Sequence, residues 1–421
     1  MAGWLVPLRD LTPAQLRAVE LPADGHRVLS GGPGSGKTLV LLHRARRLAD
    51  SLRIPEGRLL VLVYTNALTA FLRSALAELG IPESAVRTFD DWCAAHYERF
   101  VSAEKPWDER RGRPRFDAIR DGVLREVRRH PDRPPLYDAV LVDEGQDLDA
   151  HAFETLAAVS RHLTVALDPG QRIYDGGARE EEILAALRIP SRSVALLDAW
   201  RCSPCVSRLA SRLLPEGEAR QAFLRNAPTA AVEREKPLLY LARDPSDEIA
   251  RLADVSRARL LRGERVAVLL PGRRLVASIA CGLSRHGIPV EVPHRPGTRP
   301  GPFPPLDFAS DLVKVMPYHS AKGLTFDSVL LPRLSTSDVL VRGASSLLRL
   351  LFVGITRATS WVYLSAVEGD ELPLLRRLAA GAPEVVVQRH GAHGAPPAAP
   401  GGTGSEPGAP AGPGAGLTDW L

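Results

Sequence analysis

A glycine-rich segment near the N-terminus constrains the fold more than any other feature of this 421-residue chain. Residues 31–38 read Gly-Gly-Pro-Gly-Ser-Gly-Lys-Thr, between an apolar run at 27–30 and an amphipathic run at 38–49. A strand, a glycine-rich turn and a helix in this order can wrap a phosphate group, because backbone N–H groups and the helix N-terminus face the anion. The segment therefore predicts an α/β fold with a nucleotide at the end of its first strand.

The rest of the chain continues the alternation of short apolar runs with amphipathic runs, which is typical of parallel α/β sheets. The runs fall into two series of similar size, which predicts two α/β units. Strands are expected at 27–30, 59–64, 139–143, 163–167 and 194–197, then at 238–241, 266–270, 290–292, 312–315, 328–331 and 361–365, with helices at 38–49, 68–78, 246–261 and 275–285.

A second pattern complements the glycine-rich loop. The apolar strand that precedes residue 143 ends in Asp143 and Glu144. Acids after a strand are also common surface caps, but beside a phosphate loop they acquire a chemical role. Lys37 is expected to reach the β- and γ-phosphates, Thr38 and Asp143 to hold Mg²⁺, and Glu144 to activate a water molecule. These elements alone predict a Mg-nucleotide hydrolase or transferase.

The wider motif set resembles one family. Residues 143–147 read Asp-Glu-Gly-Gln-Asp, similar to the D-E-A-Q-D motif of UvrD/Rep-type superfamily 1 DNA helicases. Further segments resemble this family's motifs in the same order, over roughly residues 11–365. They are found at 11–15, 64–66, 88–90, 167–174, 199–201, 318–326 and 352–358.

The resemblance implies two RecA-like P-loop domains with the nucleotide in the cleft between them. Their expected limits are 1–195, with a small basic insertion at about 92–135, and 196–380. It also implies roles for single residues. Gln15 and Trp200 would contact adenine, Gln171 would sense the γ-phosphate, Arg201 and Arg357 would be arginine fingers, and Gly31, Gly34, Ser35, Gly36 and Gly323 would complete the nucleotide site. The implied nucleic-acid contacts are Tyr64, Asn66, Thr88, Phe89, His319 and Lys322.

The activity that the resemblance implies is ATP- and Mg²⁺-dependent translocation on single-stranded DNA with 3′-to-5′ polarity, in DNA repair, replication or recombination; RNA stays open as a substrate. The sequence departs from the family at two places. Thr325 stands where the family has a glutamate that contacts the nucleotide sugar, and residues 175–178 lack the family's base-stacking aromatic. Only residues 293–311 occupy the position of a large accessory domain, so a compact core is expected. A partner-controlled P-loop ATPase switch without unwinding, and a P-loop transferase, stay open as alternatives.

Charge and composition add smaller expectations. The net charge of +5 permits a polyanionic partner, and residues 99–133 hold 11 Lys and Arg against 7 Asp and Glu. This stretch is either a nucleic-acid contact or a solvated insertion. Four cysteines are too few for a disulfide scaffold, and no apolar run reaches the length of a membrane span, so a cytoplasmic protein is expected. Cys202 and Cys205 lack a second pair at zinc spacing.

The C-terminal segment from 381 to 421 is predicted to be a disordered tail, because Gly, Ala and Pro supply 22 of the 27 residues from 391 to 417. The chain then ends in Leu-Thr-Asp-Trp-Leu. This end is either unstructured or a short docking peptide for a protein partner around Trp420.

Overall fold

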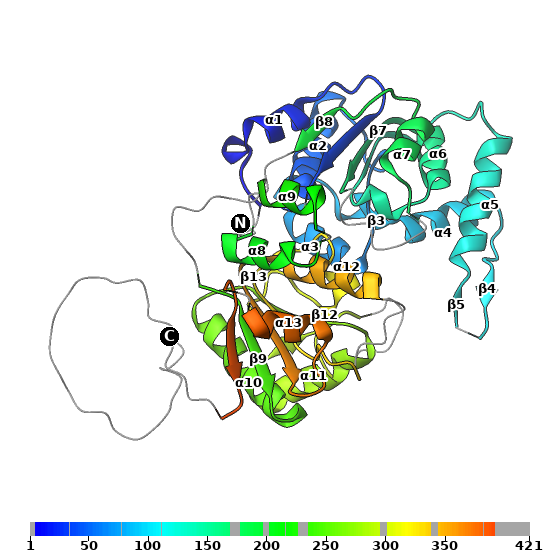
Figure 1. Ribbon diagram of the computed structural model, residues 1–421. Helices are drawn as coiled ribbons and strands as arrows, with labels where there is room; N and C mark the ends of the chain where they lie inside the picture. The colour runs from blue at the N-terminus through cyan, green and yellow to red at the C-terminus, as the bar shows by residue number, and fades with distance from the viewer. Residues whose placement is uncertain are drawn as a thin grey trace.

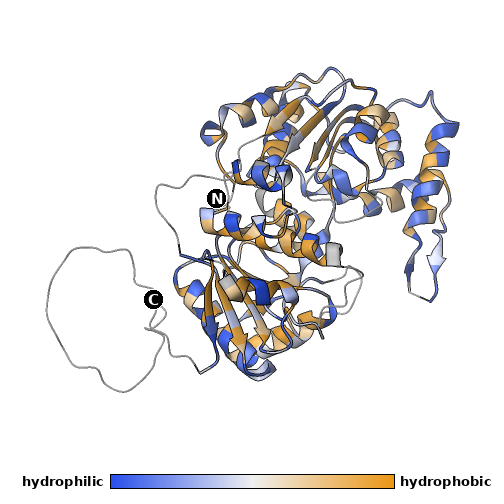
Figure 2. Cartoon of the chain, viewed as in Figure 1, coloured by the Kyte–Doolittle hydropathy of each residue, from blue (hydrophilic) through white to orange (hydrophobic). Residues whose placement is uncertain are grey.

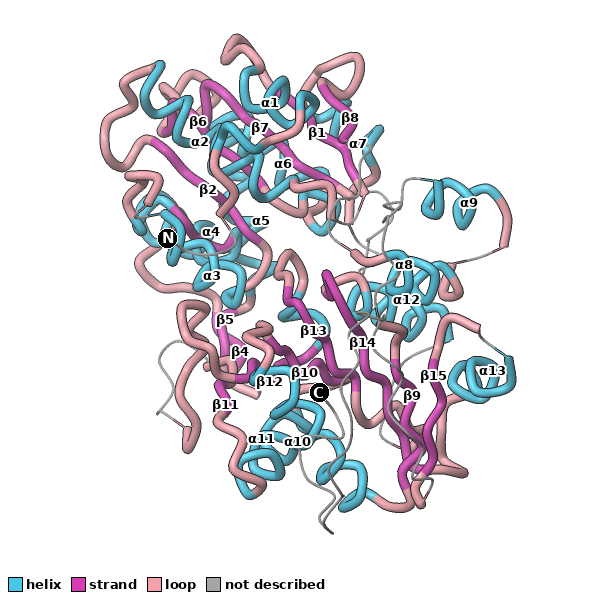
Figure 3. Tube along the Cα trace, turned by 90° about the vertical axis from the view of Figure 1, so that its left-hand side faces the viewer, coloured by secondary structure: helices cyan, strands magenta, loops and turns pink. Residues whose placement is uncertain are grey.

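The structure is a computed structural model, in which two parallel sheets are covered by helices (Figure 1). It describes residues 5–32, 34–76, 78–110, 112–168, 177–196, 202–214, 216–225, 235–294, 301–337, 344–381 and 383–391. Viewed from the side, the strands form two separate groups, one for each sheet (Figure 3).

The first sheet has the strand order β3-β2-β6-β7-β1-β8, and all its pairs are parallel. Neighbouring residues of a strand point to opposite faces, so both faces must be covered. Helices α1, α2 and α3 pack on one face, and α4 to α7 pack on the other. The strands are β1 (Arg27–Gly31), β2 (Leu59–Val63), β3 (Val86–Thr88), β6 (Tyr137–Val142), β7 (Ser160–Leu167) and β8 (Val194–Leu196). The helices are η1 (Leu8–Asp10), α1 (Pro13–Glu20), α2 (Lys37–Ser51), α3 (Asn66–Leu76), η2 (Glu83–Ala85), α4 (Phe89–Phe100), α5 (Phe116–Arg129), η3 (Gly145–Asp147), α6 (Ala150–Val159) and α7 (Glu180–Ala186).

The second sheet has the order β11-β12-β10-β13-β14-β9-β15, again with parallel pairs. Helices α10 and α11 cover one face, whereas α8, α12 and α13 cover the other. The strands are β9 (Leu238–Ala242), β10 (Val266–Leu270), β11 (Val290–Glu291), β12 (Val313–Pro317), β13 (Phe326–Leu331), β14 (Ala358–Val367) and β15 (Val386–Arg389). The helices are α8 (Pro204–Ser211), α9 (Glu218–Arg225), α10 (Pro245–Leu261), α11 (Arg274–Arg285), η5 (Tyr318–Ala321), α12 (Ala344–Ile355) and α13 (Pro373–Gly381).

The predicted fold class is confirmed, since two helix-covered parallel sheets are what two RecA-like domains contain. One prediction needs correction. The tail was expected to start at residue 381, but residues 386–389 form β15, which pairs in parallel with β9 at the edge of the second sheet. The valine run that precedes the Gly/Ala/Pro-rich segment is apolar enough to add this strand. Residues 392–421, including Trp420, lie outside the described residues.

The predicted basic insertion at about 92–135 forms a helical hairpin. Helices α4 and α5 lie side by side, and their far ends are joined by a two-stranded antiparallel ribbon of β4 (Trp107–Asp108) and β5 (Arg113–Pro114). Inside the hairpin, the buried His96 and Glu126 side chains lie 3.0 Å apart. Figure 1 shows α5 and the ribbon projecting away from both sheets, and in Figure 2 the sheet strands are hydrophobic while the ribbon is largely hydrophilic.

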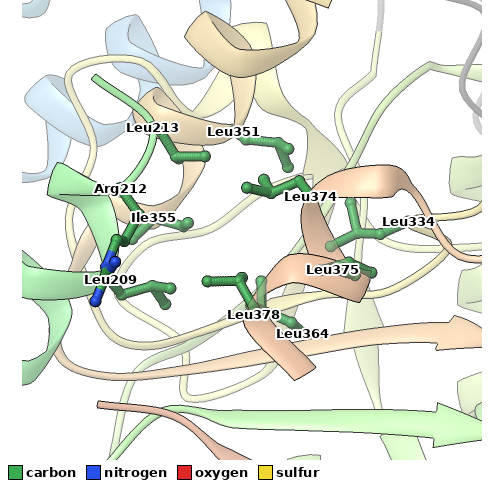
Figure 4. Close-up of a pocket in the computed structure, with 10 residues that line it drawn as sticks. All are labelled: Leu209, Arg212, Leu213, Leu334, Leu351, Ile355, Leu364, Leu374, Leu375 and Leu378. Atoms are coloured by element: carbon green, nitrogen blue, oxygen red, sulfur yellow. The ribbon is translucent and has the colours of Figure 1, made fainter. Parts of the chain in front are cut away.

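A small cavity lies between α8, α12, α13 and β14 (Figure 4). Its volume of about 10 Å³ is at most enough for one water molecule. Nearly all its lining side chains are leucines, so it is a packing defect of the second core rather than a ligand site. The lining residues are Leu209, Arg212, Leu213, Leu334, Leu351, Ile355, Leu364, Leu374, Leu375 and Leu378. In the described part of the chain, no helix is long and apolar enough to cross a membrane.

Arg44 of α2 is a fully buried cation that fixes α1 against the first sheet. Its guanidinium donates to the carbonyl oxygens of Val19 (3.1 Å) and Leu21 (2.6 Å), at the C-terminal end of α1, and to Thr164 Oγ1 (2.9 Å). The helix C-terminus carries partial negative charge, which compensates the buried cation. Burial lowers the pKa of Arg44 to about 10, and burial together with Arg44 lowers the pKa of the adjacent His162 to about 4.

We expect the substitution Arg44→Met to lower the free energy of unfolding by about 2–4 kcal/mol, because several buried acceptors lose a charged donor. The measurement is urea unfolding followed by circular dichroism. Arg47→Met is the matched control, since Arg47 is exposed on the same helix. Equal losses in the two variants would contradict the role given to Arg44.

Candidate active site

The glycine-rich loop connects β1 to α2 at the carboxyl end of the strands of the first sheet. Gly34 and Gly36 have φ values of +78° and +84°, in the left-handed region that other residues adopt at a cost. A Cβ at Gly31 would lie 2.5 Å from Ser35 Oγ and 3.0 Å from the Leu196 carbonyl oxygen. The chain can therefore turn this tightly only with glycines, and the turn leads directly into the N-terminus of α2.

Lys37 is the first residue of α2, and its side chain folds back over the loop. Its ammonium donates to the carbonyl oxygens of Gly31 (2.9 Å) and Gly32 (2.8 Å) and to Asp168 Oδ2 (3.2 Å). The side chain is 7% exposed. A buried ammonium held at the mouth of an anion-binding turn is placed for the phosphate contact that the sequence predicts.

Thr38 and Asp143 come together although they are 105 residues apart. The Thr38 hydroxyl donates to Asp143 Oδ2 at 2.6 Å, and Asp143 directly follows β6. Burial and the charge of Glu144 raise the pKa of Asp143. Hydroxyl and carboxylate oxygens are the hard donors that Mg²⁺ prefers, so this pair fits the implied ion.

Glu144 lies on the turn after Asp143 and is 4% exposed, with a φ of +55°. The Gln146 side-chain amide donates to Glu144 Oε2, and its carbonyl oxygen accepts from the Asp168 backbone N–H at 2.8 Å. Gln146 thus connects the acidic turn to the end of β7. Burial opposes ionisation of Glu144, but the charges of Lys322, Lys37 and Arg357 outweigh it and lower the pKa of this carboxyl.

Lys322 reaches this turn from the other sheet. It follows η5, its side chain is 1% exposed, and its ammonium lies 2.5 Å from Asp147 Oδ2 and 3.4 Å from Glu144 Oε2. The motif resemblance implies that Lys322 contacts nucleic acid. The structure contradicts this prediction, because a lysine buried between two carboxylates cannot reach a nucleic-acid strand.

Arg357 also belongs to the second sheet, at the turn between α12 and β14. It is 5% exposed and donates to the carbonyl oxygens of Val353 (3.1 Å) and Leu324 (3.4 Å). The neighbouring Gly323 has a φ of +80°, and a Cβ there would lie 2.7 Å from Leu68 Cδ2 of α3. The second sheet thus brings two cations to the acidic turn, across a close contact with the first.

Gln15 attaches α1 to the phosphate loop. Its amide N–H donates to the Ser35 carbonyl oxygen at 3.0 Å, and its amide oxygen accepts from the Thr12 backbone N–H at 3.0 Å. A Cβ at Gly36 would lie 2.4 Å from Gln15 Nε2. The structure places Gln15 against the phosphate loop; its contact with adenine stays a prediction.

The predicted nucleic-acid residues separate into two groups. Asn66 is exposed at the start of α3, and Tyr64 and His319 are half-buried. Thr88 and Phe89 are buried instead: the Thr88 hydroxyl accepts from the Asp91 backbone N–H and caps α4, and Phe89 packs in the core. These two side chains are not placed for contact with a strand, because a helix begins at this point and needs a cap and a core residue.

Three predicted residues, Gln171, Trp200 and Arg201, lie outside the described residues. The segment that begins at Cys202 is fixed to β14, the strand that follows Arg357. The Ser203 N–H donates to the Thr359 carbonyl oxygen (2.8 Å), and its hydroxyl donates to the Ser360 carbonyl oxygen (3.0 Å).

Three residues of the site, Gln146, Asp147 and Asp168, were not predicted from the sequence. All three lie inside segments that carry the predicted motifs, at 143–147 and 167–174. The partners of the two carboxylates, Lys322 and Lys37, are far away in the chain, and Gln146 bonds the backbone of Asp168 in another segment. Only the fold shows that they form one connected set of polar side chains.

Two family models match segments of the chain that contain part of this site, among them Lys37 and Lys322. The model of the UvrD/REP helicase N-terminal domain matches residues 11–118, and the model of the UvrD-like helicase C-terminal domain matches residues 312–365. One similar solved structure is the C-terminal domain of a possible DNA helicase from Lactobacillus plantarum WCFS1, with 16% identity and a TM-score of 0.34, covering 45% of this chain and 98% of that one. No curated protein matches the sequence. The two family matches confirm the resemblance that the motifs predict, and the chain carries UvrD-like helicase domains of both the N-terminal and the C-terminal kind.

Proposed function

We propose that the protein is an ATP-dependent translocase on single-stranded DNA, with 3′-to-5′ polarity and a role in DNA repair, replication or recombination. The observation that supports this most strongly is the contact of Lys322, from the second sheet, with the acidic turn of the first. Hydrolysis at such a site depends on how the two sheets are placed, so it can drive their relative motion. We propose a first domain over 1–195 and a second domain that begins at 196 and, because β15 pairs with β9, extends through residue 389 rather than ending at 380.

In the proposed reaction, the loop N–H groups and Lys37 bind the β- and γ-phosphates of ATP. Thr38 and Asp143 hold Mg²⁺, which neutralises phosphate charge when bound. Glu144 accepts the proton of the attacking water, and Gln146 orients Glu144 through its amide. Arg357, together with Arg201 as the family resemblance implies, stabilises the charge that develops on the transferred phosphoryl group.

The proposed strand contacts lie next to the junction of the sheets. Asn66 begins α3, and α3 contacts η5, which carries His319. His319 accepts a hydrogen bond from Arg273 Nε at 3.3 Å, so a cation lies beside this neutral imidazole. A nucleic-acid strand held by these residues would contact α3 of the first sheet and η5 of the second.

The end of the α4–α5 hairpin is a second proposed nucleic-acid contact. Trp107 is 54% exposed there, and Arg110, Arg113 and Arg115 are exposed around it, with no ion pair among the described residues. Exposed aromatic rings stack on bases, and arginines pair with phosphates. This combination favours contact with nucleic acid over a merely solvated insertion.

The alternative is a P-loop ATPase switch under the control of a protein partner, without unwinding. The burial of Thr88 and Phe89 favours it, because two expected strand contacts are lost. A partner could dock through Trp420. Stimulation of ATP hydrolysis by single-stranded DNA distinguishes the two functions. A P-loop transferase would instead place the phosphate on an acceptor.

Two substitutions test the chemistry. Lys37→Ala should abolish ATP hydrolysis and weaken ATP binding, because the phosphates lose their cation. Glu144→Gln should retain ATP binding but reduce turnover by about 100-fold or more, because an amide cannot accept the proton. Phosphate release and binding of a fluorescent ATP analogue measure the two effects, with Glu154→Gln, on the exposed face of α6, as control. Turnover of Glu144→Gln at the parent rate would disprove the assignment of the base.

Strand displacement tests what the motor can do. Opening each base-pair step costs about 1.4 kcal/mol, and the open fork must be kept apart. The chain has only a short segment in place of the accessory domain. We therefore expect DNA-stimulated ATPase and translocation, with displacement that falls off steeply as a 3′-tailed duplex is lengthened. Efficient separation of long duplexes by the protein alone would contradict this.

The hairpin contact has its own test. Trp107→Ala should weaken binding of single-stranded DNA by about 5- to 100-fold, the range that loss of one stacked base produces. Fluorescence anisotropy with a labelled oligothymidylate measures it. Leu261→Ala is the matched control, since Leu261 is 61% exposed on α10. Unchanged affinity of Trp107→Ala would assign the hairpin to another role.

A further inference from the structure

Arg44 connects the middle of α2 with the C-terminal end of α1. Its side chain is fully buried, and its guanidinium donates to the carbonyl oxygens of Val19 (3.1 Å), Leu21 (2.6 Å) and Pro22 (3.2 Å). It also donates to Thr164 Oγ1 on β7, at 2.9 Å. A guanidinium presents its N–H groups in a rigid plane, so this set of acceptors leaves it a single position. The C-terminal end of α1 is therefore fixed both to α2 and to the first sheet.

The N-terminal turn of α1 carries Gln15, whose side chain is 8% exposed. Its amide oxygen accepts from the Thr12 backbone N–H and its amide N–H donates to the Ser35 carbonyl oxygen, each at 3.0 Å. A backbone N–H only donates and a carbonyl oxygen only accepts, so the amide group has one orientation. A Cβ at Gly36 would lie 2.4 Å from Gln15 Nε2, so this amide lies directly against the phosphate loop.

The hydrogen bond to Ser35 fixes the orientation of a peptide group in the loop. The peptide between Ser35 and Gly36 is trans, so its N–H points opposite to its carbonyl group. Backbone N–H groups attract a bound phosphate, whereas a carbonyl oxygen that faced it would repel it. Because Gln15 holds the Ser35 carbonyl towards α1, the Gly36 N–H points away from α1. The loop thereby keeps an N–H group available to an anion.

We propose that Arg44 is a positioning residue for the phosphate loop. It fixes the C-terminal end of α1, α1 holds Gln15 against Ser35, and Gln15 holds the peptide that follows Ser35 in the orientation that admits phosphates. The effect acts on the phosphate groups and does not depend on the base. This inference rests on the ATP site of the proposed function, and it adds a residue that contacts neither the nucleotide nor Mg²⁺.

Inorganic triphosphate is the probe that separates the phosphate groups from the base. Its dissociation constant is measured by competition with a fluorescent ATP analogue, on the full chain without DNA. Arg44→Met and Gln15→Ala should each weaken triphosphate binding by about 3- to 10-fold, the range that loss of one hydrogen bond produces. The double variant should bind triphosphate no more weakly than Gln15→Ala alone, because the two residues act in series.

Steady-state hydrolysis of ATP separates positioning from loss of folded protein. Arg44→Met should raise the KM for ATP by about the factor by which it weakens triphosphate binding, while kcat stays within about twofold of the parent value. A variant that only loses folded protein would instead lower kcat at an unchanged KM.

Arg47→Met, on the exposed side of α2, is the matched control and should leave both KM and triphosphate binding unchanged. All variants are compared at a temperature at which circular dichroism shows them folded. If Arg44→Met does not fold, Arg44→Lys decides. A lysine keeps the charge but cannot reach all these acceptors at once, so that variant should weaken triphosphate binding by about twofold or more.

Triphosphate binding at the parent strength in the folded Arg44 variant would overturn the proposal, and so would additive losses in the double variant. A parent protein that binds neither ATP nor triphosphate would overturn it together with the proposed function. If DNA fails to stimulate hydrolysis while the variants behave as expected, the translocase function fails and the role of Arg44 stands.

Discussion

The buried ions between the two sheets impose the constraint on which the rest of the structure depends. Lys37, Lys322 and Arg357 lie close to the carboxylates of Asp143, Glu144, Asp147 and Asp168, and none of these residues is more than 9% exposed. Removing an ion from water costs several kcal/mol unless a partner of opposite charge lies within reach. The first sheet supplies all four carboxylates but only one of the three cations. The sheets must therefore stay together for the charges to be compensated, and any ligand that brings negative phosphates changes the balance that holds them.

The sequence predicts the fold well where strands are buried on both faces. Runs such as Leu59–Val63 and Val266–Leu270 are apolar throughout, because helices cover both sides of a parallel sheet. It fails for β3 and β15 but not for β8 and β11, which are edge strands as well. β3 has only three residues, one of them an exposed arginine, and β15 follows a helix beside a Gly/Ala/Pro-rich segment. Edge strands are paired on one side only, so their sequences carry a weak pattern. The role of Arg44 also cannot be predicted from the sequence, since most of its acceptors are backbone carbonyl oxygens.

The candidate site divides along a similar line. The proximity of Thr38 and Asp143 can be predicted, because the carboxyl ends of all strands in a parallel sheet lie on the same side, although β7 separates β1 from β6. The burial of the Lys322, Thr88 and Phe89 side chains cannot be predicted from the sequence. A motif gives the position of a residue along the chain, but the direction of its side chain depends on the elements around it. Thr88 caps the helix that follows it, and Lys322 contacts the acidic turn of the other sheet.

Residues 307–310, which lie before β12, add a further contact between the two sheets. Glu291 accepts from the Asp307 N–H at 2.7 Å, and Lys314 donates to the Ser310 carbonyl oxygen at 2.9 Å, so residues 307–310 are fixed to the edge of the second sheet. Phe308 then meets Phe71 of α3 edge-on, with ring centroids 5.3 Å apart. This segment, which the family resemblance places at the position of a large accessory domain, is thus itself a contact between the sheets, on the same helix that Gly323 approaches. Because both contacts converge on α3, which itself packs on β2 and β3, a rotation of one sheet against the other must rearrange the packing on this helix, and its exposed first residue is Asn66.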